Sequence, residues 1–169
     1  MPRDPEQQGR LVAGVYASVA FRLFRDIVEA GVLPAGDAAA TERARAEWGC
    51  FALYACVRGL VAGSGFHRET ALALDTLHAQ VLAASIEAAP VDGAPPPDLV
   101  AARYAEYGSI GRASGAAKAI EVERRLGAAA ARHMAAPAEA SPELIDVVTA
   151  MHEALVEGVV QAVREDQGG

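Results

Sequence analysis

Apolar side chains recur every three or four residues along almost the whole chain, and this spacing constrains the fold more than any other feature. The first such set carries branched and aromatic side chains: Val12, Val15, Tyr16, Val19, Leu23, Phe24, Ile27 and Val28. An α-helix gathers residues with this spacing on one face, because it makes one turn in about 3.6 residues. No stretch shows the alternation that is typical of a strand. We therefore predict an all-α fold, a single-domain antiparallel bundle of about six helices.

Glycine, proline and capping residues divide the chain into the expected elements. We predict helices over residues 5–30, 37–62, 67–88, 98–107, 116–135 and 142–166. Asp37, Asp98 and Ser141 are expected to cap three of them, because their side chains accept bonds from free amides. A proline-rich loop is expected over residues 89–97, and a short linker over residues 136–140. Three glycines between Gly108 and Gly115 predict a break or kink, since each lowers helix stability by roughly 1 kcal/mol.

The second predicted helix is unusual because its second half is apolar nearly all round. It starts with charged residues and changes character at Trp48, after which Arg58 is its only charged residue. A helix with this pattern lies either in the centre of its own fold or under a partner. This helix is the main reason for predicting a homodimer. In the fifth predicted helix, we expect Ile120, Leu126 and Met134 to face inward.

Charge argues against several kinds of partner. The net charge is −7. Residues 1–97 hold 8 basic and 11 acidic side chains, residues 98–135 hold 6 and 4, and residues 136–169 hold 1 and 7. A nucleic-acid surface needs clustered basic residues, so no nucleic-acid partner is expected. The longest apolar runs, which end at Arg22 and Arg58, fall short of a membrane span, so we expect no membrane contact and a cytoplasmic location.

The sequence contains no complete catalytic set, and no cofactor is expected. Cys50 and Cys56 lack the spacing of a redox pair. On one helix they point about 120° apart, so they cannot form a disulfide and are expected to be buried. No nucleophile elbow or strand is present. A weak alternative is a metal site built from Asp75, His78, His152 and Glu153. That set is incomplete, because the last two are adjacent and face apart.

The densest polar cluster predicts a surface for a ligand or partner. Arginine and tyrosine dominate binding hot spots, and here they occur together with one glutamate. The predicted surface comprises Tyr54, Arg58, Arg103, Glu106, Tyr107 and Arg112. The alternative is a solvated helix face with a local ion pair between Arg103 and Glu106. A second possibility is an anion site at Gly115, with Arg112 and Lys118 nearby.

These observations favour a non-enzymatic helical interaction or regulatory domain, expected to form a homodimer. The expected partners are a second copy, another protein or a small apolar ligand. One alternative is a small-molecule-binding protein or enzyme with a cavity between helices, lined by Tyr54, Arg58, Arg103, Tyr107 and His152. The other alternative is a metal-binding helical bundle.

Overall fold

The computed structural model describes residues 4–86, 94–113 and 118–168, and its secondary structure is helical. Its six helices are α1 (Pro5–Glu29), α2 (Ala38–Ser64), α3 (Arg68–Ile86), α4 (Pro97–Ala113), α5 (Ala119–Ala135) and α6 (Pro142–Gly168). The described residues contain no strand. The all-α prediction is therefore confirmed, and the predicted order of helices is correct.

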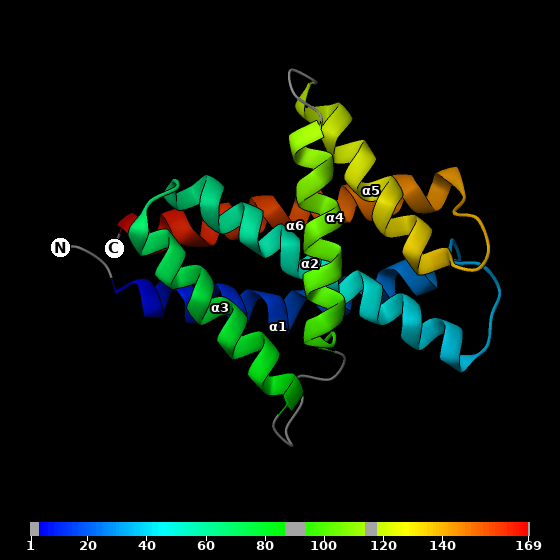
Figure 1. The fold of residues 1–169 in the computed structure, drawn as a ribbon, viewed down its shortest axis with the longest axis horizontal. Helices are drawn as coiled ribbons and strands as arrows, with labels where there is room; N and C mark the ends of the chain where they lie inside the picture. Colours follow the sequence, from blue (N-terminus) through cyan, green and yellow to red (C-terminus); the bar gives the residue numbers. More distant parts are fainter. Residues whose placement is uncertain (1–3, 87–93, 114–117, 169) are drawn as a thin grey trace.

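The longest helices lie lengthwise, and the fourth crosses them (Figure 1). Helix α1 runs opposite to α2, as the short turn between them requires, whereas α2 and α6 run in the same direction. Short connections make only consecutive helices antiparallel, and α2 and α6 are not consecutive. Helix α4 lies steeply across α2 instead of alongside it (Figure 1). The prediction of a simple antiparallel bundle is correct for α1 and α2 but misses this crossing.

Helix α2 is the centre of the molecule. Its side chains from Trp48 to Leu60 are mostly buried against α1, α4, α5 and α6. The Trp48 indole Nε1–H donates a 2.7 Å hydrogen bond to the carbonyl of Ala20, which fixes α2 against α1. The apolar half of α2 is thus covered within one chain and needs no partner to cover it. Despite this apolar stretch, no helix of the described residues is both long and apolar enough to cross a bilayer.

Helices α2 and α6 approach closely at Gly59. A Cβ atom at this position would lie 2.6 Å from the Cβ of Val159 and 2.8 Å from the carbonyl oxygen of Val156. Only a residue without a side chain leaves room for this contact. One turn later, Gly63 lies against Val163 in the same way. The two helices can therefore pack backbone to backbone over two turns.

Two of the three predicted caps are confirmed. The Asp37 carboxylate accepts a 2.8 Å bond from the Ala40 amide, and the Ser141 hydroxyl accepts a 3.1 Å bond from the Leu144 amide. The third prediction is wrong, because α4 begins at Pro97 and places Asp98 in its first turn. A proline fits the first helical position because its missing N–H would have no partner there.

The fourth helix is longer than predicted, because α4 continues through Gly108 and Gly111 and ends at Ala113, inside the segment Gly108–Gly115 where a break or kink is expected. The cost of these glycines is offset by tertiary contacts of α4 with α2 and α5. Residues 114–117, including the proposed anion site at Gly115, lie outside the described residues. In α5, Ile120 does not face inward, since 73% of it is exposed. Most of the predicted loop 89–97 also lies outside the described residues.

Candidate functional site

The predicted surface residues come from two helices that cross, with Tyr54 and Arg58 on α2 and the other four on α4. Glu47, Phe51, Tyr54 and Arg58 recur at three- and four-residue intervals on α2, and Tyr107 of α4 lies above them. We call this face the α2–α4 seam. The Tyr107 ring centroid is 5.2 Å from those of both Phe51 and Tyr54. Aromatic packing therefore fills the middle of the seam.

An ion pair closes each end of the seam. Arg103 donates two bonds to Glu47, at 2.6 and 2.7 Å, so the predicted local pair between Arg103 and Glu106 is wrong. Glu106 instead bonds Arg132 and His133 of α5. This face of α4 points toward α2 and α5. Arg103 and Glu106 therefore pair with residues of those helices and not with each other. Arg112, the remaining predicted residue, is exposed in the last turn of α4.

At the other end, Arg58 joins α2, α5 and α6. Its guanidinium makes two bonds to the Glu123 carboxylate, one of them 2.7 Å long. The same Nη1 group lies 3.2 Å from Nε2 of His152, whose side chain is fully buried. Because a guanidinium only donates, Nε2 accepts, and the imidazole proton sits on Nδ1. Burial and the nearby charge of Arg58 lower the pKa of His152 to about 3, while the carbonyl of Phe51 acts in the opposite direction.

The second histidine of interest, His78, is fixed by two hydrogen bonds. Its Nδ1 group donates to the Leu74 carbonyl at 2.7 Å, and its Nε2 accepts from the Tyr104 hydroxyl at 3.0 Å. Burial lowers the pKa of His78, partly opposed by the Leu74 carbonyl and the charge of Asp75. Both ring nitrogens are occupied, and no three His, Cys, Asp or Glu side chains of the described residues come together as a metal site would require. The predicted metal set is therefore not assembled by the fold.

Burial disfavours the charged forms of the two thiols and of the Tyr107 phenol in and beside the seam. Burial raises the pKa of Cys50 and Cys56 to about 12, so neither thiol ionises readily. Burial also raises the pKa of the Tyr107 phenol far above its ordinary value. Both cysteines are free and buried, as predicted. Only the Tyr107 hydroxyl and His152 Nδ1 are buried side-chain polar atoms without a hydrogen bond of ordinary geometry in the described part of the chain.

A different feature, missed by sequence reasoning, lies where α1 ends and α2 begins. A hollow of about 580 Å³ opens between these helices, lined by six residues of α1 from Ser18 to Val28 and by Thr41, Glu42 and Arg45 of α2. We call it the basic groove. Its apolar part is Phe21, Phe24 and Val28, and the Arg45 guanidinium lies over the Phe21 ring at 5.0 Å from the centroid. This is a cation–π contact, in which the face of the ring attracts the guanidinium charge.

Three arginines and one glutamate line the basic groove, on a chain whose net charge is −7. Arg22 and Arg25 lie one turn apart on the exposed side of α1. Neither makes an ion pair or a side-chain hydrogen bond with a described residue. Two arginines that make no ion pair with a described residue, beside exposed apolar surface, can bind an acidic partner.

Helix α6 offers a surface of opposite character. A second hollow, of about 340 Å³, is lined by Val156 and Val160 together with Glu157, Gln161, Arg164 and Glu165. Both glutamates are exposed. Nothing approaches the position of a Cβ at Gly158 within 4 Å, so this stretch of α6 is open to an incoming surface. We call it the acidic α6 face.

The sequence contains a signal for the basic groove that periodicity alone does not identify. Arg22 and Arg25 interrupt the aromatic stripe of α1, but which of these residues face solvent depends on how α3 and α6 cover the helix. The chain matches no protein-family model, and no curated protein or solved structure is significantly similar to it.

Proposed function

We propose that the protein is a non-enzymatic helical interaction domain that forms a homodimer, with the basic groove of each copy holding the acidic α6 face of the other. The observation that carries this proposal is the pair Arg22 and Arg25, which make no ion pair with a described residue and lie beside exposed apolar surface. The non-enzymatic part is supported by the Cys50 and Cys56 thiols and the His152 imidazole, none of which changes charge near neutral pH.

Charge complementarity supports a second copy as the occupant. The groove carries three arginines and Glu42, and the acidic α6 face carries two glutamates and Arg164, so each surface has the opposite pattern to the other. Both surfaces also contain apolar side chains, Phe21 and Val28 on one and Val156 and Val160 on the other. Residues 136–169 contain seven acidic residues and one basic residue, which makes the last helix the most acidic part of the chain.

The pairing is compatible with a closed dimer. In a twofold dimer, the basic groove of one copy meets the acidic α6 face of the other. The symmetry then brings the α6 face of the first copy against the groove of the second. Two grooves and two α6 faces would then be buried together. A polyanion such as nucleic acid is a poorer occupant, since the groove is small and the rest of the chain would repel it at moderate salt.

A charge-swap experiment tests this pairing. The groove variant Arg22→Glu/Arg25→Glu and the face variant Glu157→Lys/Glu165→Lys each place like charges opposite one another. Each should raise the dimer dissociation constant about 100-fold, equivalent to roughly 2.7 kcal/mol. Mixed together, they should form a heterodimer, because the reversed groove then meets a reversed face while both native surfaces also meet. Sedimentation velocity and light scattering at low salt report these masses against the 17.5 kDa chain.

The matched control is Arg68→Glu/Arg124→Glu, which reverses two exposed arginines outside the groove. It should leave the dimer intact. A wild-type chain that is monomeric at tens of micromolar would remove the proposal. Dimers that survive both reversals would show that another surface joins the copies, and would equally overturn the pairing.

A further inference from the structure

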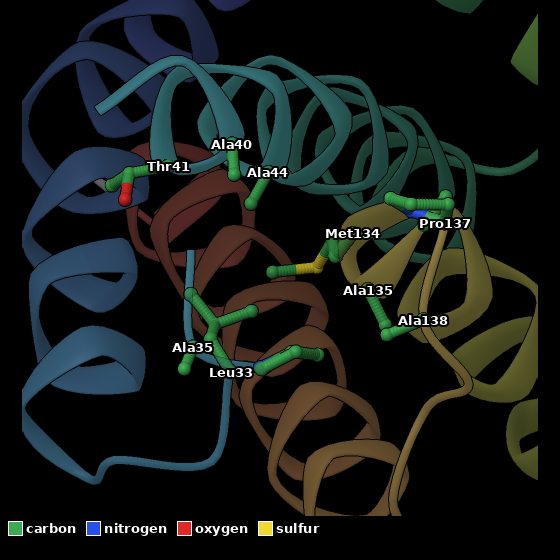
Figure 2. Close-up of a pocket in the computed structure, with 11 residues that line it drawn as sticks. Leu33, Ala35, Ala40, Thr41, Ala44, Met134, Ala135, Pro137 and Ala138 are labelled. Atoms are coloured by element: carbon green, nitrogen blue, oxygen red, sulfur yellow. The ribbon is translucent and has the colours of Figure 1, made fainter. Parts of the chain in front are cut away.

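A small pocket lies beside the start of α2, on the side that faces α5 (Figure 2). Three segments line this partly open pocket: the turn containing Leu33, the first turns of α2, and the end of α5 with the chain that follows it. Figure 2 shows the side chains of Ala44, Met134 and Leu33 around the hollow. Its volume is about 160 Å³. The pocket is separate from the α2–α4 seam, and no predicted site residue lines it.

The pocket is lined without a single charged side chain. Its residues are alanines, two prolines, a leucine, a methionine and Thr41. The prolines, Pro34 and Pro137, have no N–H group to donate. The Thr41 hydroxyl already donates to the Asp37 carbonyl at 3.3 Å. At the end of α5 the Ala135 carbonyl accepts a 3.0 Å bond from the Ala138 amide, and because a carbonyl oxygen has two lone pairs it can accept a second bond. A charged ligand would lose its hydration here without a compensating ion pair.

We infer that this pocket binds one uncharged, benzene-sized small molecule that carries at most one hydroxyl, such as a phenol. The size supports this class, because an apolar cavity of about 150 Å³ in another protein stays dry and binds benzene. The chemistry supports it as well: the ring contacts apolar side chains, and one hydroxyl can donate to a backbone carbonyl. Met134 adds adaptability, since an unbranched thioether adjusts to the outline of a ligand.

The test uses the full-length chain labelled at its methionine methyl groups, with phenol as the probe. The sequence has three methionines, and Met134 is the one that lines the pocket. Phenol should shift the Met134 methyl signal saturably, with a dissociation constant in the millimolar range or below, and should leave the Met151 signal in place. A capped phenylalanine amide serves as a second probe, because it carries the same ring on a peptide backbone.

Three substitutions fill or spare the pocket. Ala40→Leu places a larger side chain in the pocket and should weaken phenol binding at least 10-fold, whereas Ala39→Leu, on the exposed side of the same turn, should not. Ala138→Leu fills the pocket from the other side and replaces Ala40→Leu if that variant does not fold. Unsaturable shifts, equal shifts at Met151, or unchanged binding in the filled variants would overturn the inference. Tighter binding of the phenylalanine amide than of phenol would also overturn it, in favour of a partner's side chain.

Discussion

Replacing Gly59 by leucine is expected to destabilise the fold by about 3 kcal/mol or more, because overpacking costs typically 1–3 kcal/mol even where neighbours can adjust. Here one neighbour is the carbonyl oxygen of Val156, 2.8 Å from the position of the new Cβ, and helix backbone cannot move aside alone. The leucine side chain would push α6 away from α2, the central helix. Typical domains are stable by only 5–15 kcal/mol, so such a loss is a large share of the total.

Urea unfolding followed by circular dichroism measures the effect. The matched control is Gly14→Leu, because Gly14 is exposed, also lies within a helix, and would have no neighbour within 4 Å of an added Cβ. This control should be as stable as wild type or more stable by up to about 1 kcal/mol, since leucine favours the helix more than glycine does. Equal urea midpoints for Gly59→Leu and wild type would mean that the close contact between α2 and α6 is absent in solution.

The sequence predicted the helices well because their signals are local. Asp37 and Ser141 cap the helices they precede, and the apolar period identifies which segments are helical. The exact buried face of α1 was harder to predict. Tyr16 and Phe24 are buried as expected, but 43% of Val28 is exposed and lines the basic groove. Which flank of a wide apolar stripe is covered depends on the neighbouring helices, and no local rule specifies them.

The polar residues were less predictable because their partners are distant in sequence. Arg103 pairs with Glu47, 56 residues away, and Arg58 pairs with Glu123, 65 residues away. Sequence reasoning gathered Tyr54, Arg58 and Tyr107 into one surface, and the fold does place them in one seam. It did not foresee that the crossing of α4 would cover this surface. The steep angle of α4 follows from tertiary packing, so the sequence period carries no information about it.

Acidification from pH 6.5 to pH 5 is expected to destabilise the wild-type chain by about 2 kcal/mol through His152 alone. The folded-state pKa of this residue is about 3, below its value of about 6.5 in an unfolded chain. Between these values the unfolded state binds a proton that the folded state does not, so stability falls as the pH falls, by about 1.4 kcal/mol per pH unit. Above pH 6.5 both states are neutral and the effect disappears.

The variant His152→Phe isolates this contribution. In the wild-type chain, the ring centroids of Phe51 and His152 are 3.9 Å apart. Phenylalanine at position 152 keeps a ring stacked on Phe51 but cannot take up a proton. The free energy of unfolding is measured for both proteins at pH 7.5, 6.5, 5.8 and 5.0. Between pH 6.5 and 5.0, the wild-type chain should lose about 2 kcal/mol more stability than the variant. Taking the difference cancels His78 and the carboxylates, which titrate in both proteins. Parallel curves would show that the imidazole is protonated or solvated in the folded chain. Arg58 then could not lie against it as the structure places it, because two cations 3.2 Å apart would repel.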